Sequence, residues 1–115
     1  MLIGVDLSIE QWDTVLRILL EKSHFPFFDM AYQGFSKRGA IEQDAYPIRQ
    51  FAQTQKPMFL AQSFSKNMGM YGCRIGTFSF SCVNEEEVAR MMSEAKLEAR
   101  QLWSNPPKFG SSIGK

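Results

Sequence analysis

Two long segments of the chain carry apolar residues at helical spacing. Near the start, Ser8 and Gln11 form a capping-box pattern, and apolar residues then recur at intervals of three and four positions. This pattern predicts an amphipathic helix over residues 9–22. Asn84 opens a second segment of the same kind, which predicts a long helix over residues 85–103 with acidic residues in its first turn.

A weaker helical pattern and three short apolar segments lie between these two helices. Asp44 can cap a helix over residues 45–54. The apolar runs at residues 25–29 and 58–62 do not alternate, which is typical of strands buried on both faces. Residues 77–83 alternate between apolar and polar side chains and are predicted to form a third strand. Its short connection to the strand before it favours an antiparallel pair.

The order helix, strand, helix, strand, strand, helix predicts an α/β fold, with helices packed on a mixed sheet. The carboxyl ends of parallel strands meet at one edge of such a sheet, and ligands bind at that edge. Asp29 ends the first predicted strand and Lys66 follows the second. We therefore expect Asp29 and Lys66 to lie at the same crevice. Residues 111–115 stop without a capping element, so the end of the chain is expected to be cut rather than finished.

Composition narrows the class of protein. The 115 residues suit one modest domain, and 44% hydrophobic with 22% charged residues is ordinary for a globular chain. A net charge of +1 argues against nucleic-acid binding, and the apolar runs are too short to cross a membrane. Two cysteines make neither a disulfide framework nor a zinc site, and no metal site is expected. A reducing compartment, by default the cytoplasm, is expected, with mitochondria an open alternative.

The most informative chemistry lies around Lys66. An amine at the end of an apolar strand can form a Schiff base with a carbonyl cofactor. Ser63 and Arg74 can bind a phosphate, one through its hydroxyl and one through its guanidinium fork. Aldehyde chemistry beside a phosphate anchor suggests pyridoxal phosphate. The residues alone leave a simpler interpretation open, because a lysine at a strand end is usually a solvated charge and serines often form turns.

Three motifs in order resemble the aspartate aminotransferases, which are fold-type-I pyridoxal-phosphate enzymes. FFDMAYQGF at residues 27–35 resembles the segment that contacts the cofactor ring, and QSFSKNMGMYG at residues 62–72 resembles the segment with the cofactor-binding lysine. RQLWSNPP at residues 100–107 resembles the segment that contacts substrate across the dimer interface. The resemblance runs from Gly4 onward and keeps the spacing between motifs. It implies that residues 1–115 are the central part of the large, pyridoxal-phosphate-binding domain.

The resemblance implies roles for the residues around the cofactor. Lys66 would bind the cofactor aldehyde and move the substrate Cα proton, which makes it the implied catalytic residue. Asp29 would face the pyridine nitrogen and Tyr32 would hydrogen-bond the phenolic oxygen of the ring. Without the resemblance, Asp29 is a turn aspartate and Tyr32 a half-buried aromatic. The implied phosphate ligands are Ser63, Ser65 and Arg74.

The resemblance also implies a substrate site shared between two subunits. Arg100 would grip the distal carboxylate of aspartate or glutamate in the other subunit of a homodimer, with Ser104 and Asn105 in the same interface segment. Without the resemblance, Arg100 is a cation favoured at a helix carboxyl end, and Ser104 and Asn105 are helix terminators. The implied reaction moves an amino group between L-aspartate and 2-oxoglutarate, giving oxaloacetate and L-glutamate. Aromatic amino acids remain open as further substrates.

The chain also departs from the family pattern. Met1-Leu2-Ile3-Gly4 stands where the family has Asn-Pro-Thr-Gly, and Cys73 stands where a glutamate is usual. The family's N-terminal part and C-terminal small domain supply a phosphate-binding loop, a ring-stacking aromatic and the arginine for the substrate α-carboxylate. None of these is found in the 115 residues, so we expect a fragment. The alternative is a catalytically inactive, truncated homologue or an interaction remnant.

Overall fold

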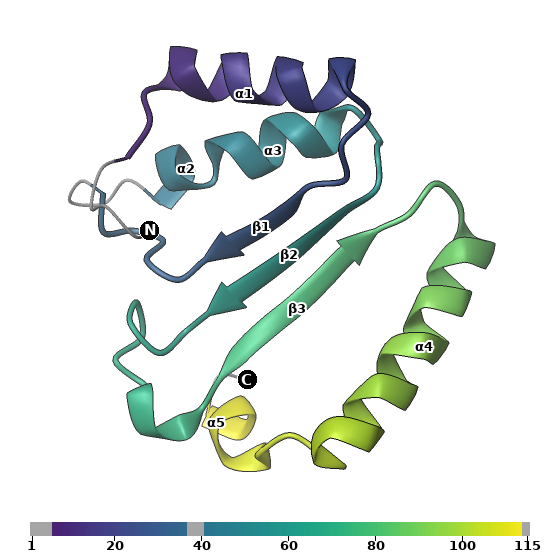
Figure 1. The fold of residues 1–115 in the computed structure, drawn as a ribbon. Helices are drawn as coiled ribbons and strands as arrows, with labels where there is room; N and C mark the ends of the chain where they lie inside the picture. Colours follow the sequence, from purple (N-terminus) through teal and green to yellow (C-terminus); the bar gives the residue numbers. More distant parts are fainter. Residues whose placement is uncertain (1–5, 37–40, 114–115) are drawn as a thin grey trace.

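A three-stranded mixed sheet forms the centre of the protein. The computed structural model describes residues 6–36 and 41–113. The strands are β1 (Phe27–Met30), β2 (Met58–Ser63) and β3 (Gly76–Ser81), in the order β1-β2-β3. β1 pairs with β2 in parallel, and β3 pairs with β2 antiparallel (Figure 1). The sequence-based prediction of an α/β fold with an antiparallel third strand is therefore confirmed.

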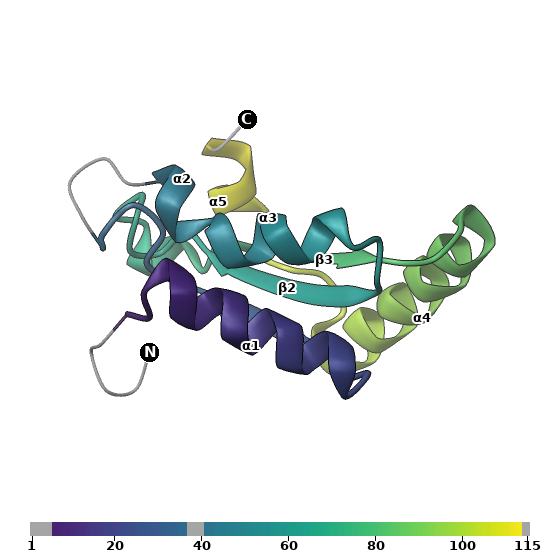
Figure 2. The ribbon, with the colours of Figure 1, turned by 90° about the horizontal axis from the view of Figure 1, so that it is seen from above.

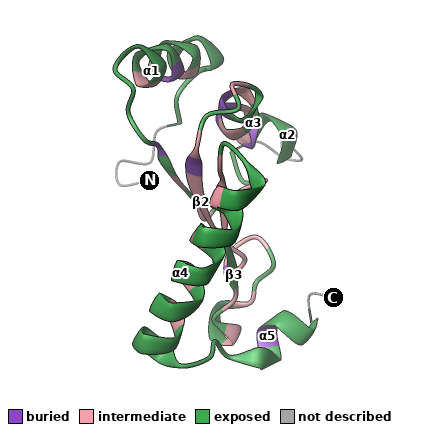
Figure 3. Cartoon of the chain, turned by 90° about the vertical axis from the view of Figure 1, so that its right-hand side faces the viewer, coloured by how far each residue is buried: buried purple, intermediate pink, exposed green. Residues whose placement is uncertain are grey.

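Five α-helices and one short 3₁₀ helix surround this sheet within the described residues. They are α1 (Ile9–Glu21), α2 (Ile41–Asp44), α3 (Tyr46–Gln53), η1 (Tyr71–Cys73), α4 (Glu85–Trp103) and α5 (Lys108–Ile113). Helices α1 and α3 lie together on the β1 side of the sheet, and α4 lies on the β3 side, away from them (Figures 1 and 2). Every residue of α4 is described and none is buried (Figure 3).

The hydrophobic core is small and lies where α1 and α3 meet β1 and β2. Its buried members are Leu16 of α1, Phe51 of α3 and Met58 of β2. Phe28 of β1 packs against this cluster, with its ring centroid 6.0 Å from that of Phe51. Because successive side chains of a strand point to opposite faces, Phe28 points toward the core and its neighbour Phe27 away from it.

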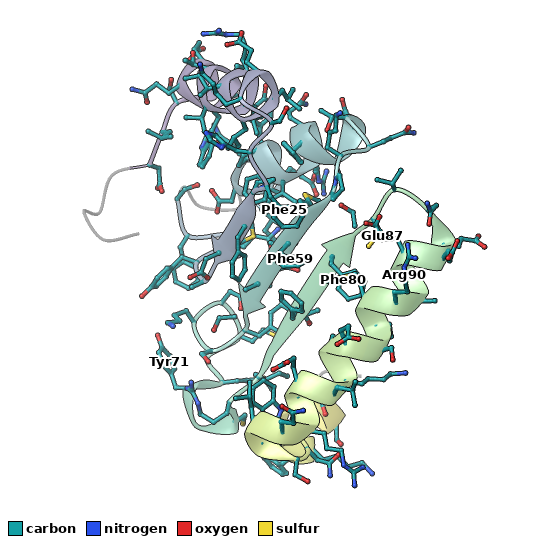
Figure 4. The ribbon with its side chains drawn as sticks, turned by 45° about the vertical axis from the view of Figure 1, so that its right-hand side comes forward. Phe25, Phe59, Tyr71, Phe80, Glu87 and Arg90 are labelled. Atoms are coloured by element: carbon teal, nitrogen blue, oxygen red, sulfur yellow. The ribbon has the colours of Figure 1, made fainter. Side chains whose placement is uncertain are left out.

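The opposite face of the sheet carries a row of phenylalanines (Figure 4). The rings of Phe25 and Phe59 are 4.7 Å apart, and those of Phe59 and Phe78 are 5.3 Å apart, both edge to face. Phe27 is nevertheless 63% exposed. The prediction that residues 25–29 and 58–62 are buried on both faces is therefore wrong, because no described element covers this face and only Met58 is buried in β2.

The exposed faces make the chain more open than a typical domain of its size. Its accessible surface is 8855 Å², whereas a compact monomer of this mass exposes roughly 6,400 Å². The radius of gyration is 15.8 Å, against about 13 Å for a compact chain of this length. The stability of the fold therefore rests on few buried side chains.

The two long helices form as their sequence patterns predict. The Ser8 hydroxyl accepts a hydrogen bond from the Gln11 amide, and the Gln11 side chain accepts one from the Ser8 amide, which completes the capping box. The Asn84 side chain accepts from the Glu87 amide at 2.9 Å. The boundaries of α4 coincide with the prediction, and α1 ends one residue early at Glu21.

Other boundaries differ from the prediction. β1 begins at Phe27 rather than at residue 25, and β3 spans Gly76–Ser81 rather than 77–83. Asp44 does not cap the third helix: it ends α2, and α3 begins after Ala45 without a side-chain cap. Helix α5 was not expected at all. The departure at residues 1–4 lies outside the described residues.

One hydrogen bond that joins α1 to α3 gives a testable pH dependence. The Tyr46 hydroxyl donates to Asp13 at 2.6 Å, and this bond raises the pKa of Tyr46 above its ordinary value of about 10. A raised pKa means that the bond stabilises the fold at neutral pH and that this contribution is lost as the pH rises through the folded-state pKa. We expect Tyr46→Phe to lower the urea midpoint at pH 7, and the gap from the wild type to close above pH 10. An equal gap at both pH values would contradict this role.

Candidate functional site

The candidate site lies at the edge of the sheet where the parallel strands β1 and β2 end. Asp29 pairs with Ala61, and the next residues, Met30 and Gln62, are the last pair of the ladder. The turn that follows β1 contains Tyr32, and the turn that follows β2 contains Lys66 (Figure 1). The predicted meeting of the two strand ends at one edge is confirmed, although 37 positions separate Asp29 from Lys66 in the sequence.

Lys66 and Tyr32 are in direct contact across this edge. The Lys66 ammonium lies over the Tyr32 ring, 5.5 Å from its centroid, as in a cation–π pair. The backbone holds Lys66 in a tight turn, in which the Gly69 amide donates to the Lys66 carbonyl at 3.1 Å. Gly69 has a φ of +66°, which favours glycine at this position. The turn therefore presents the amine toward the segment that follows β1.

The two serines beside Lys66 have different environments. Ser65 is 4% exposed, and its backbone amide donates to the Ser63 hydroxyl oxygen at 3.3 Å. The Ser63 O–H therefore stays available as a donor. The side-chain oxygen of Asn67 is buried and has no hydrogen-bond partner among the described residues. A buried acceptor without a donor is uncommon, and it marks the Lys66 turn as a place where a further group is expected.

Arg74 lies on the exposed segment between η1 and β3. Its backbone is left-handed, with φ 47° and ψ 57°. Its Nη1 donates to the Tyr71 carbonyl at 3.1 Å, which leaves other guanidinium N–H groups for an anion. The next residue, Ile75, accepts a hydrogen bond from the Phe64 amide at 3.1 Å, so the Arg74 segment and the Lys66 turn are joined by the backbone.

Asp29 is exposed at the end of β1. It forms no hydrogen bond or ion pair with another described side chain, and it makes no direct contact of this kind with Lys66. By strand alternation it lies on the same sheet face as Phe27. The structure thus brings Asp29 to the correct edge and leaves its carboxylate available to a ligand.

Arg100, Ser104 and Asn105 lie at the far end of α4 and do not join this cluster. All three are exposed, and among the described residues no side-chain hydrogen bond links them to the Lys66 turn. The Ser104 amide donates to the Arg100 carbonyl at 3.1 Å and the Asn105 amide to the Trp103 carbonyl at 2.7 Å, which ends the helix. Their role in substrate binding stays a prediction.

Comparison with known proteins decides the family. The sequence profile of aminotransferases of class I and II matches residues 3–114. The chain belongs to this aminotransferase family. It is 49% identical over 110 residues to the mitochondrial aspartate aminotransferase of Schizosaccharomyces pombe, and 44% identical to the aspartate aminotransferase of Pseudomonas aeruginosa. Each alignment covers 96% of this chain, but only 25% and 27% of the respective relative.

Solved aminotransferase structures share the fold. The aromatic-amino-acid aminotransferase of Burkholderia pseudomallei, solved with covalently bound pyridoxal phosphate, superposes with a TM-score of 0.89 at 40% identity. That match covers 96% of this chain and 27% of the Burkholderia chain. The chain therefore has the fold of part of the large domain of a fold-type-I aminotransferase and spans about a quarter of the length of its relatives. Those relatives include mitochondrial, chloroplastic and cytoplasmic proteins.

The donor set of this aminotransferase segment fits pyridoxal phosphate. The hydroxyl of Ser63 and the guanidinium of Arg74 suit a phosphate, and the ammonium of Lys66 suits an aldehyde. The exposed carboxylate of Asp29 suits a protonated ring nitrogen. No group of three or more side chains suited to a metal ion occurs within residues 6–36 and 41–113. Over the same residues, no helix has the length and apolar character of a membrane span.

The sequence did not predict that the Asp44 carboxylate stabilises the turn that follows Tyr32. One oxygen of Asp44 accepts from the Gly34 amide at 2.6 Å, and the other accepts from the Ser36 hydroxyl. Gly34 has a φ of +92°, so the turn needs glycine there. The Asp44 carboxylate is therefore used to close the turn after Tyr32, which explains why it does not cap α3.

We expect Asp44→Ala to loosen the turn that holds Tyr32. Losing a charge-assisted bond to a backbone amide costs about 1.5–3 kcal/mol, so amide exchange at Gly34 should speed up by roughly 10- to 100-fold. Hydrogen–deuterium exchange measures this directly. Glu42→Ala is the matched control, because Glu42 lies on the same short helix as Asp44 and pairs with exposed Arg49. Unchanged exchange at Gly34 would show that Asp44 does not hold the turn.

Proposed function

We propose that this chain is the central part of the pyridoxal-phosphate-binding domain of an aspartate aminotransferase. The observation that carries the proposal is the contact between Lys66 and Tyr32 at the edge of the sheet, beside Ser63 and Asp29. An amine, a phenol, a hydroxyl and a carboxylate there match what the aldehyde, the phenolic oxygen, the phosphate and the ring nitrogen of the cofactor each require. Relatives named aspartate aminotransferase align with 96% of this chain.

In this proposal, each residue of the site has a separate role in cofactor binding or proton transfer. The Lys66 amine would hold the aldehyde carbon and afterwards move the proton of the substrate Cα. Asp29 would keep the ring nitrogen protonated, and Tyr32 would hydrogen-bond the phenolic oxygen. Ser63, Ser65 and Arg74 would anchor the phosphate by hydrogen bonds and charge. Pyridoxal phosphate, when bound, supplies an electrophilic carbonyl and a ring that accepts electrons.

The proposed reaction transfers the amino group of L-aspartate to 2-oxoglutarate, giving oxaloacetate and L-glutamate. Both substrates carry a second carboxylate, and Arg100 would bind it as a bidentate fork from the other subunit of a homodimer. Ser104 and Asn105 would belong to the same interface. Aromatic amino acids stay open as further substrates, since a structural relative is named for them. We propose the cytoplasm as compartment, with mitochondria as the alternative, since Cys73 and Cys82 are both free thiols.

A second candidate function follows from the openness of the site. Asp29, Tyr32 and Arg74 are all exposed, and Tyr32 is 51% exposed. Exposed charges are screened by water, which weakens the electrostatic stabilisation on which catalysis depends. In this alternative the chain is a catalytically inactive homologue or a partner-binding remnant that keeps part of a cofactor site.

One experiment separates the two candidates. The purified 115-residue chain is mixed with pyridoxal phosphate, reduced with borohydride, digested and weighed. The proposal expects one cofactor mass per chain on the peptide that contains Lys66. A parallel assay adds L-aspartate with 2-oxoglutarate and measures oxaloacetate. An adduct with turnover excludes the inactive homologue or remnant. An adduct without turnover supports the cofactor site in a chain that spans about a quarter of its relatives' length. No selective adduct on Lys66 rejects the proposed cofactor site and favours the partner-binding remnant.

A further inference from the structure

Helix α5 approaches the segment that contains Arg74 so closely that only glycine fits at the contact. Gly110 is the one buried residue of α5 (Figure 3). A Cβ placed on Gly110 would lie 2.8 Å from the carbonyl oxygen of Cys73, 3.0 Å from the Cys73 Cβ and 3.2 Å from the Ile75 Cβ. The nearest of these atoms belongs to the backbone, so it cannot move aside as a flexible side chain would. Any other residue at this position must push α5 away.

The two residues that Gly110 touches are the neighbours of Arg74 on either side. Arg74 itself has the left-handed backbone, with φ 47° and ψ 57°. A residue other than glycine keeps this conformation only where its surroundings hold it. On one side, the Cys73 amide donates to the Met70 carbonyl at 3.2 Å. On the other, the Ile75 carbonyl accepts from Phe64, two residues before Lys66.

We propose that Gly110 is a positioning residue for phosphate binding: the seating of α5 on Cys73 and Ile75 holds Arg74 in the conformation that presents its guanidinium at the site. The inference rests on the proposed function, in which Arg74 anchors the cofactor phosphate. It adds a residue 36 positions away in sequence that touches neither cofactor nor substrate. The exposed side of α5 has no part in it, since Phe109 and Ser111 point away from the contact.

The test compares two aldehydes that differ only in the phosphate. Pyridoxal phosphate and pyridoxal are titrated into the chain, and the borohydride-trapped mass on Lys66 gives an apparent affinity for each. We expect Gly110→Ala to reduce the preference for the phosphorylated aldehyde by about tenfold, the scale of one lost charge-assisted contact, with pyridoxal unchanged. Ser111→Ala, an exposed neighbour, keeps the wild-type preference. Arg74→Ala reproduces the loss, and the double variant is no worse than Arg74→Ala alone.

A second measurement tests whether α5 packs on Cys73 and Ile75, and it needs no cofactor. Gly110→Ala should raise the alkylation rate of the Cys73 thiol severalfold, while the Cys82 thiol at the far end of β3 keeps its rate as an internal control. A chain that ends at Pro107 lacks α5 and therefore lacks its contact with Cys73 and Ile75. It should show the same weaker preference for pyridoxal phosphate and the same faster alkylation of Cys73. This variant keeps the test decisive if Gly110→Ala folds poorly.

The outcomes distinguish the inference from the proposed function. Faster Cys73 alkylation with an unchanged aldehyde preference overturns the positioning role and leaves phosphate binding by Arg74 intact. A wild-type chain that shows no preference for pyridoxal phosphate overturns the role of Arg74, and the inference with it, whatever Cys73 does. An equal loss of both aldehydes shows a general structural effect and also overturns the inference.

Discussion

Lys66→Ala is expected to abolish the cofactor mass that borohydride traps on the chain. The amine of Lys66 lies over the Tyr32 ring at the edge of the sheet, and no other described lysine is placed there. Alanine offers no nucleophile for the aldehyde and no base for the substrate proton. Removing a positioned acid or base lowers turnover by about 10²- to 10⁴-fold, and the loss of the covalent attachment adds to this. Intact-mass spectrometry and the oxaloacetate assay measure the two effects.

The control for this variant is another lysine of the same chain. Lys96 is exposed on α4, a helix with no buried residue, so Lys96→Ala should keep the adduct and any turnover. Lys66→Arg keeps the positive charge above Tyr32 but removes the nucleophilic amine, and it should lose the adduct as Lys66→Ala does. A full cofactor mass on either Lys66 variant would show that another amine reacts, and the assignment of Lys66 would then be wrong.

The centre of the site could be predicted because local patterns and one topological rule were enough. Strand ends can be read from apolar runs, and parallel strands must end at the same edge. These two features of the sequence predict that Asp29 and the Lys66 turn lie together, and the contact of Lys66 with Tyr32 agrees with this. The specific roles of these residues came from motif resemblance, since spacing alone does not distinguish a catalytic lysine from a solvated one.

The supporting contacts could not be predicted because they depend on long-range packing. Asp44 looked like a helix cap, since an aspartate before a helical segment usually caps it, but its carboxylate closes the Gly34 turn instead. The role of Gly110 could not be predicted from the sequence. A glycine that is required because a neighbouring segment packs closely against it cannot be told from any other glycine in the sequence. The proposed place of Arg100 beside a substrate would depend on a second subunit, which one sequence does not position.

The fold shows the same division between local and long-range information. Helices α1 and α4 are fixed by caps and periodicity, both of which act over a few residues. The burial of strands depends on what lies above the sheet. Continuous apolar runs predicted two covered faces, but the phenylalanine row around Phe59 is covered by no described element. The sequence pattern of the strands therefore suits a larger protein, which agrees with relatives about four times as long.

Phe51→Ala is expected to have the largest effect on stability of any single substitution in the described residues. Phe51 is 1% exposed and joins α3 to α1 and to Phe28 of β1. Replacing a buried phenylalanine with alanine costs about 3–5 kcal/mol, since it removes apolar contacts and leaves a cavity. A domain has only about 5–15 kcal/mol of stability in total, and this core has three buried apolar members, so this one substitution should remove a large part of the stability.

Urea titration followed by far-UV circular dichroism measures this loss. Phe109→Ala is the matched control, because Phe109 is 72% exposed and its removal should shift the midpoint little. Phe51→Leu keeps most of the apolar volume and should fall between the wild type and Phe51→Ala. If Phe51→Ala cost less than about 0.5 kcal/mol, the range of a surface substitution, the cluster of Leu16, Phe51 and Met58 would not be what holds α1 and α3 on the sheet. Because the Lys66 turn follows β2 directly, the same variant should also form less of the selective adduct, whereas Phe109→Ala should retain it.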